Sequence, residues 1–419
     1  MENLFTISGM SDFLWPFLIY FLIVMSILIL YKVIKERKNL FPQEKIDKKK
    51  IIGPVAITTG AMLGTGSVIG VLGSSNRLAA SGELHFEAII IWILIGILVF
   101  LPVMLIEPAM AKVVNGSPSV YIKKAFNKKM GVLYAVLITL LYSFGFAGFQ
   151  FSAIGSIGNT VANEYLKIDI SQVDIFLMFI LPIIIIVSII IITKKHKIFI
   201  DSLSVIVGIA VILYLCILGL FFINTADYIP VYFQKAMEGF LNPVNFAVGV
   251  PLGLLVGWQR IVQVSEPGLG TKAMAAMEND NGRRVSAILM TAATLFVVLI
   301  ACIGTTYVAS YGMEHGTFML PADANDRISY YLHTLDSIVG SLGAFAAAFY
   351  LFFAALSTIL GSYFFLDLLL DFSINKKIII AITLMLVAGI FAVFGFDVVL
   401  DAIDLLTLLI IFYCAIMKF

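Results

Sequence analysis

The sequence predicts an all-α integral membrane protein with about eleven transmembrane helices. Of its 419 residues, 61% are hydrophobic and only 13% are charged, and a soluble domain could not cover so much apolar surface with polar groups. Largely uncharged windows of roughly 18 or more residues recur along the chain, and each is long enough to cross a bilayer as a helix. They lie at 14–31, 51–73, 88–111, 132–157, 175–192, 199–223, 245–262, 285–311, 339–366, 378–396 and 398–417.

Basic residues predict the orientation of the helices. The segment 32–50 holds eight lysines and arginines, which places it in the cytoplasm and the N-terminus outside. The later connections 112–129, 194–197, 272–284 and 376–377 are also basic and fall on the same side, so that an eleventh helix ends in the cytoplasm. The segments 225–240 and 323–335 then lie outside, either as short helices at the membrane interface or as loops.

Composition also narrows the classes of protein. The net charge of +1 does not suggest a nucleic-acid partner, and nothing in the chain resembles a nucleophile–base pair or a metal cluster. We therefore do not expect an enzyme. The low charge and the abundance of Ile and Lys point to the plasma membrane of a bacterium or archaeon.

The second window contains the stretch TTGAMLGTGSVIGV, with glycines at 60, 64, 66 and 70. Each glycine inside a helix costs roughly 0.5–1 kcal/mol relative to alanine. One interpretation is close packing of helices, because small residues four apart let helices touch in lipid. The other is a helix broken at the middle of the bilayer, whose freed carbonyls bind a cation and whose freed N–H groups bind a carboxylate.

The seventh window carries a similar interruption at Gly249, Pro251, Gly253 and Gly257, because proline lacks the backbone donor that a helix interior needs. Without the first helix, ten windows remain, and the interrupted helices are the first of each set of five. They enter the membrane from opposite sides, as in a transporter built from an inverted repeat. We predict an N-terminal helix and basic linker over 1–50, a first repeat over 51–223 and a second over 224–419.

Several polar side chains lie within the windows. Ser357 and Thr358 in the ninth window are candidate cation ligands, although hydroxyls in such helices often bond to the preceding turn. Gln150 could bind a zwitterion or join two helices. Trp258 could cap a small substrate or serve only in packing.

Carboxylates at membrane depth are also candidates for function. Glu107 is expected at the cytoplasmic end, in an interface or a gate. Asp397, Asp401 and Asp404 share one helix face near the outside, where they could line a solvated entrance or couple transport to protons.

Three motifs together resemble the alanine/glycine:cation (sodium:alanine) symporter family. GTGSVIGV is similar to the family's Gly-Thr-Gly-Asn-Ile-Ala-Gly-Val, SEPGLGTKAMAAM to its Asn-Glu-Ala-Gly-Leu-Gly-Ser-Ala-Pro, and STILG to its Thr-Thr-Ile-Leu-Gly. They occur in the family's order over about residues 53–401. The resemblance implies a LeuT-type fold of the amino acid–polyamine–cation superfamily, a 5+5 inverted repeat preceded by one extra helix.

The resemblance also implies binding residues. A sodium ion would be held by carbonyls of Gly60, Leu63 and Ala354 with the hydroxyls of Ser357 and Thr358, and a second sodium would use Ala61 and Ser67. The substrate carboxylate would meet N–H groups near Thr65 and Gly66, and the remaining substrate-binding residues would be Ser67, Gln150, Gly257 and Trp258. The chain departs from the family at Ser67 and Ser265, where the family has Asn, and at Lys272, which replaces a small residue.

We therefore expect a sodium-coupled symporter that works as a monomer and imports a small neutral amino acid such as alanine or glycine, with Na+ as coupling ion and no organic cofactor. Proton coupling on the same fold, through an aspartate or Glu107, is an alternative. An ion channel is an alternative from another class.

Overall fold

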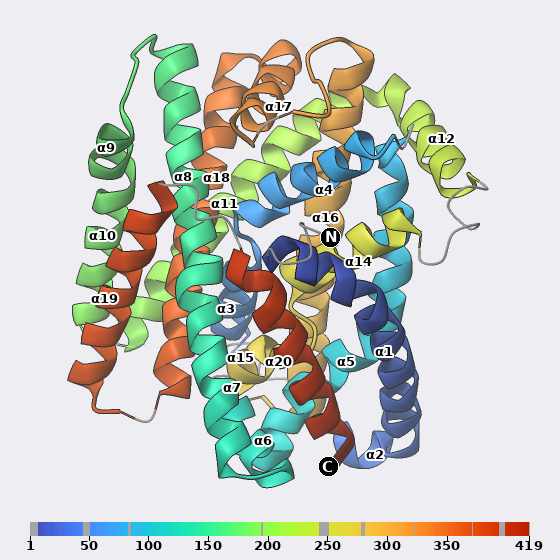
Figure 1. Ribbon diagram of the computed structural model, residues 1–419, viewed down its shortest axis with the longest axis vertical. Coiled ribbons are helices and arrows are strands. Elements are labelled where there is room, and N and C mark those ends of the chain that lie inside the picture. The colour runs from blue at the N-terminus through green and yellow to red at the C-terminus, as the bar shows by residue number, and fades with distance from the viewer. Residues whose placement is uncertain are drawn as a thin grey trace.

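In the computed structural model the chain is a bundle of helices, as the composition predicts (Figure 1). The structure describes residues 7–44, 51–82, 85–193, 196–242, 251–277, 281–322, 324–370, 372–393 and 399–418, and these ranges contain no β-strand. The predicted all-α class is confirmed.

Eight helical segments are long and apolar enough to cross a membrane. Two of them are compound: α7 continues through a π-helical segment, Leu141–Phe146, into α8, and a second π-helical segment, Phe176–Ile180, joins α9 to α10. The helices in these eight spans are α1 (Ile7–Lys35), α5 (Ile89–Val114), α7 (Lys128–Leu140) with α8 (Ala147–Thr160), α9 (Gln172–Ile175) with α10 (Leu181–Ile192), α11 (His196–Asn224), α16 (Arg283–Glu314), α18 (Ser341–Leu369) and α19 (Ile374–Val393).

Helices α3 (Ile52–Met62) and α4 (Ile69–Ala80) meet at a bend of 61°, and they make a ninth candidate span when the bent pair is counted as one broken helix and not as a re-entrant loop. The two remaining predicted windows correspond to α14 (Leu252–Ser265) and α20 (Val399–Lys418). Residues 243–250 and 394–398 lie outside the described residues, and with them Gly249 and Asp397. The number of eleven spans therefore stays a prediction.

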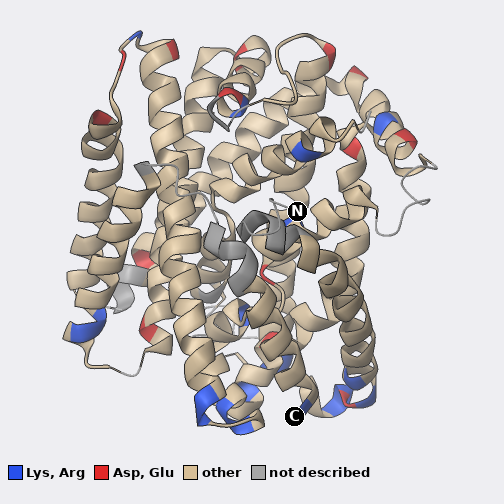
Figure 2. Cartoon of the chain, in the orientation of Figure 1, with Lys and Arg blue, Asp and Glu red and all other residues tan. Residues whose placement is uncertain are grey.

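Short helices lie at both ends of the bundle. One end carries α12 (Ile229–Phe240) and α17 (Ala324–Val339), so the two segments predicted as interface helices or loops are helical. The other carries α2 (Arg37–Leu40) and α6 (Pro118–Ala125), whereas α15 (Thr271–Met277) is buried inside the bundle (Figure 1). Lysines and arginines gather at this second end, around α2, α6 and the starts of α7 and α19 (Figure 2).

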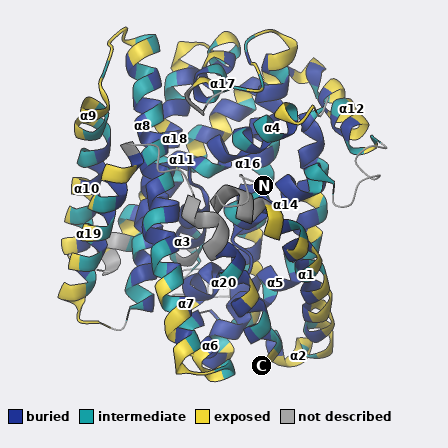
Figure 3. Ribbon diagram, viewed as in Figure 1, coloured by how far each residue is buried: buried dark blue, intermediate teal, exposed yellow. Residues whose placement is uncertain are grey.

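Burial separates central helices from helices that face lipid (Figure 3). In the most apolar stretches of α5 and α18, 61% of the residues are buried, against 28% in the span formed by α9 and α10. A helix with an exposed apolar surface is stable in hydrocarbon, because its backbone groups are all bonded within the helix. The central helix α18 packs against α3, α8, α11 and α17, and it thereby brings its polar residues to the bend between α3 and α4.

Candidate functional site

The second predicted window is interrupted where its glycines lie. The last hydrogen bond of helix α3 runs from the Leu63 N–H to the carbonyl of Thr59, at 2.6 Å. The next residue, Gly64, has an extended conformation. One 3₁₀ turn, Thr65–Ser67, leads into α4. The last carbonyls of α3 and the first N–H groups of α4 thus have no partners within their own helices, which is the condition for an ion or carboxylate site at membrane depth.

Gly64 is the point of closest approach between three segments. A Cβ atom there would lie 2.6 Å from Nε2 of Gln150 on α8 and 2.7 Å from Oγ1 of Thr358 on α18. Its φ of −80° is available to any residue. Glycine is therefore required by space and not by backbone strain.

Gln150 binds the break itself. Its Oε1 accepts the Thr65 N–H at 3.0 Å and the Thr65 hydroxyl at 2.7 Å. The side chain therefore satisfies an N–H donor at the start of the 3₁₀ turn that follows α3. The Thr65 N–H that was expected to meet a substrate carboxylate is held by Gln150 in this conformation.

The proposed cation ligands lie on the other side of the break. Ser357 donates to the carbonyls of Gly60 at 3.1 Å and Ala354 at 2.8 Å. Thr358 donates to Gly60 at 3.1 Å and to Ala61 at 3.3 Å.

The family resemblance assigns five oxygens to the sodium site, and four of them are joined by these hydrogen bonds. The fifth, the Leu63 carbonyl, takes no part in them. All four residues are buried. Neutral oxygens of this kind suit Na+, a hard cation that takes oxygen ligands.

Ser67 is tied into the 3₁₀ turn and to α18. Its hydroxyl donates to the Gly64 carbonyl at 2.7 Å and lies 2.8 Å from the Tyr350 hydroxyl, and its carbonyl accepts from Thr305 at 3.2 Å. The serine that replaces the family's asparagine therefore has bonds on both sides of the turn. Tyr350 and Thr305 were not predicted, because nothing in their local sequence distinguishes them from other buried hydroxyls.

Gly361 is a further residue that sequence reasoning missed. A Cβ on Gly361 would lie 3.1 Å from Cα of Ala61, so this glycine lets α18 approach the last turn of α3. Its place directly after the STIL sequence was the available signal.

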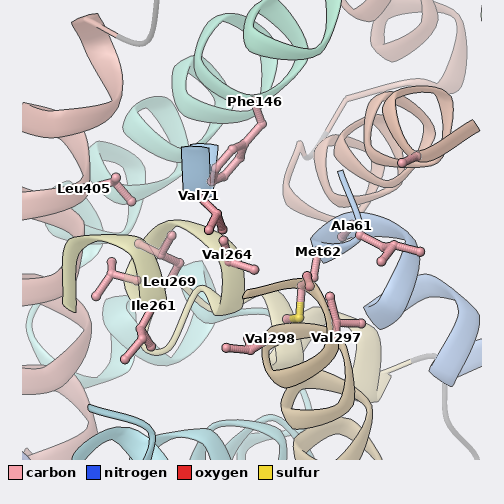
Figure 4. Packing of buried hydrophobic residues seen from close by; sticks show 14 of the residues in the cluster. Ala61, Met62, Val71, Phe146, Ile261, Val264, Leu269, Val297, Val298 and Leu405 are labelled. Carbon is pink, nitrogen blue, oxygen red and sulfur yellow. The ribbon is translucent and has the colours of Figure 1, made fainter. Parts of the chain in front are cut away.

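The apolar residues around the break also pack closely: Met62 lies beside Val297 and Val298 of α16 (Figure 4), and Thr294 of the same helix donates to its sulfur at 3.3 Å.

A cavity of about 280 Å³ opens beside the break. Gly64, Gly66, Gln150 and Thr358 line it, together with three charged side chains, those of Arg260, Glu266 and Arg327. Arg260 lies against α4, where a Cβ on Gly70 would be 2.1 Å from its Nη1, and its Nε donates to Ser74 at 3.0 Å. The cavity is large enough for a small amino acid and polar enough to orient one.

Other predicted residues lie elsewhere. Trp258 donates from Nε1 to the Trp92 carbonyl at 3.2 Å and packs on Phe100, and Gly257 lies against Trp92. Neither residue is among those that line this cavity, and both pack on α5. The side chains of Asp401 and Asp404 lie outside the described residues.

Glu107, which was expected in an interface or a gate at the cytoplasmic end, is fully buried. Its carboxylate accepts the N–H groups of Gly268 at 3.0 Å, Lys272 at 2.9 Å and Ala273 at 3.3 Å. These bonds fix the loop after α14 and the start of α15. Glu107 is therefore a structural anchor between α5 and the SEPGLGTK segment.

Comparison with known proteins agrees with this architecture. The model of the sodium:alanine symporter family matches residues 3–417. The solved structure of a Na+-coupled sialic acid symporter, in a substrate-bound outward-open state, is 14% identical, covers 92% of this chain and 81% of its own, and superposes with a TM-score of 0.54. At that identity the likeness concerns the fold alone. No curated protein matches the sequence.

The close approach at Gly64 gives a first prediction. In Gly64→Ala the methyl group should separate Gln150 and Thr358 from the break, and we expect binding of alanine in the presence of sodium to weaken at least about tenfold, equivalent to about 1.4 kcal/mol. Isothermal titration of the purified protein measures this. Gly208→Ala in α11, where a Cβ meets nothing within 4 Å, is the matched control. Equal affinity of the two variants would contradict the assigned geometry.

Proposed function

The chain belongs to the sodium:alanine symporter family and is therefore a sodium-coupled membrane symporter and not an enzyme; from this premise we propose that it imports a small neutral amino acid such as alanine or glycine by alternating access. The observation that supports this substrate best is the convergence at Gly64 of the α3–α4 break, Gln150 and Thr358. These groups form the wall of one small cavity.

The proposed coupling has a simple electrostatic origin. The carbonyl end of α3 carries the negative end of that helix's dipole and favours a cation, while the N–H end of α4 carries a positive end and favours a carboxylate. Both ends belong to one continuous stretch of backbone, Gly60–Ser67. A cation that orders this stretch prepares the N–H groups for the substrate, and by linkage the substrate tightens the cation equally.

The proposed sodium site consists of the carbonyls of Gly60, Leu63 and Ala354 and the hydroxyls of Ser357 and Thr358. The two hydroxyls donate to carbonyls. To bind Na+ they would turn their protons away, so that their lone pairs face the ion. For a second sodium, Ala61 and Ser67 are the proposed ligands, and Ser67 would have to give up its bond to the Gly64 carbonyl.

The proposed substrate site uses Thr65, Gly66, Ser67 and Gln150. For a carboxylate to reach the Thr65 N–H, Gln150 has to release it, and the freed amide can then bind the substrate's own polar groups. Gly257 and Trp258 are left out of this set because they pack on α5.

We further propose that the end of the bundle rich in lysine and arginine is cytoplasmic, with the N-terminus outside and the C-terminus inside a bacterial or archaeal plasma membrane. The basic residues around α2 and α6 support this orientation (Figure 2). The division into a linker over 1–50 and repeats over 51–223 and 224–419 belongs to the same proposal, as does function as a monomer.

Sodium dependence is the direct test of the proposed ion site. Thr358→Ala removes one oxygen ligand, and we expect the sodium concentration for half-maximal alanine uptake into proteoliposomes to rise about tenfold, or about 1.4 kcal/mol of binding free energy. Thr160→Ala is the control, because Thr160 is also a buried threonine but bonds only to the carbonyl of Ser156 in its own helix. An unchanged sodium requirement in Thr358→Ala would argue against the site. Undiminished uptake by the wild type without sodium at fixed pH would argue against sodium coupling.

The substrate site is tested by the size of residue 66. A Cβ on Gly66 would lie 3.7 Å from Phe149, an ordinary contact, so Gly66→Ala should retain alanine binding within a few-fold. Gly66→Leu fills the cavity beside the N–H groups and should abolish binding while the protein still folds. Titration calorimetry measures binding, and counterflow of labelled alanine separates a carrier from a channel. Binding by the leucine variant would favour the interpretation of these glycines as helix packing.

A further inference from the structure

One carboxylate in the cavity, that of Glu266, has no part in the proposed sodium and amino acid sites. Glu266 follows the last turn of α14, in the left-handed conformation with φ of 47°. Its side chain is 2% exposed, and it lines the cavity together with Gln150 and Thr358. A buried carboxylate beside a transport cavity needs a partner of positive charge or a proton.

The hydrogen-bond partners of Glu266 permit either charge state. Its Oε2 accepts from the Tyr142 hydroxyl at 3.2 Å and from the Thr271 hydroxyl, and those two hydroxyls lie 2.7 Å from each other. Hydroxyls can donate to a carboxylate or accept from a carboxylic acid by rotation of one hydrogen. Backbone N–H groups, which hold Glu107, can only donate and so favour its ionised form.

Glu266 lies apart from the proposed amino acid site. Its partner Tyr142 precedes Gln150 by eight residues, on the path from the π-helical segment Leu141–Phe146 into α8. The groups that act on its carboxylate, Tyr142, Thr271 and Lys272, are not residues of the proposed amino acid site. Glu266 therefore belongs to the inner end of the cavity, toward α15.

The charges around Glu266 do not balance when both buried carboxyls are ionised. Lys272 of α15 is fully buried, and its ammonium donates to the Ser265 carbonyl. It is the positive group shared by Glu266 and by Glu107 of α5. One ammonium against two carboxylates leaves an excess of one negative charge.

The other titratable groups near Glu266 do not remove that excess. Tyr142 and Tyr134 face it from the α7–α8 span, and a phenol is neutral near pH 7. Arg260 on α14 donates to Ser74 of α4, and Arg327 of α17 lines the same cavity. The charged groups that act most strongly on Glu266 are nevertheless Lys272 and Glu107. Burial raises the pKa of Glu266 to about 7, although Thr271, Lys272 and Tyr142 each lower it.

We propose that Glu266 is a proton-binding site at the inner end of the cavity, whose carboxylate takes up one proton from the cavity to become a carboxylic acid and so completes the charge balance with Lys272 and Glu107. Transport by this chain is then linked to pH as well as to sodium. Only this transport consequence rests on the proposed function. The proton binding itself does not.

Lys272 is the cation on which this charge balance depends. Removal of the ammonium in Lys272→Ala leaves two buried carboxyls without a cation. Glu266 should then hold its proton more tightly and release it at a higher pH.

Infrared difference spectroscopy of the purified full-length protein between pH 5 and pH 9 tests the site directly. We expect a carboxylic-acid carbonyl band that is lost as the pH rises through about 7, is absent in Glu266→Gln and moves to higher pH in Lys272→Ala. Glu314→Gln, at the exposed pair with Lys235, should leave the band unchanged. Absence of the band in the wild type, or its persistence in Glu266→Gln, would overturn the proposal. Loss of the band on addition of sodium at pH 6 would overturn it too, because Glu266 would then bind sodium in place of a proton.

Thr271→Val supplies a second variant if Glu266→Gln does not fold. Loss of the hydroxyl that donates to Glu266 destabilises the carboxylate, so the band should persist to higher pH, and an unchanged midpoint would contradict the assignment. In proteoliposomes with a fixed sodium gradient, wild-type uptake should change at least about threefold between pH 6 and pH 8, and Glu266→Gln should lose this dependence. If uptake needs no sodium, the proposed function fails while the infrared result still decides the proton site.

Discussion

The close approach of three helical segments at Gly64 is the constraint on which the rest of the site depends. Because this residue has no side chain, Gln150 and Thr358 both reach the gap between α3 and α4. Gln150 then satisfies a donor of the gap, and Thr358 satisfies acceptors at the end of α3. A broken helix is stable at membrane depth only when protein groups or a cavity replace the lost helical bonds. Here they also define where an ion and a substrate can bind.

The two ends of the cavity use different electrostatics. Around the break, the ligands are hydroxyls and carbonyls without formal charge, so an ion can enter and leave without breaking a strong ion pair. At the inner end, Glu266, Lys272 and Glu107 are buried together. Full charges at such depth are costly unless they are balanced. This difference separates the proposed sodium site at the break from the proposed proton site at Glu266.

Glu107 shows why the inner end can hold titratable groups. Its three backbone bonds anchor the loop between α14 and α15 to α5. The Tyr134 hydroxyl holds the same loop from α7, at 2.5 Å from the Leu269 carbonyl. Glu266 and Lys272 are thus positioned by a loop that is bonded on two sides. The segment SEPGLGTK forms a buried connection at the inner end of the cavity.

The sequence by itself determined the fold class, because hydropathy is a local signal, and its glycine spacing pointed to the second window as either a packing seam or a broken helix. The residues proposed for the sodium site came from the family resemblance, with only the paired hydroxyls of Ser357 and Thr358 visible as a local signal. Only the tertiary structure decided that Trp258 packs on α5, that Tyr350 and Thr305 hold Ser67, that Gly361 lets α18 approach α3, and that Glu266 lines the cavity. These assignments depend on which face of a helix meets which neighbour. A glutamate after a helix or a glycine within one has the same local signal in many environments, and its role is set by groups far away in the chain.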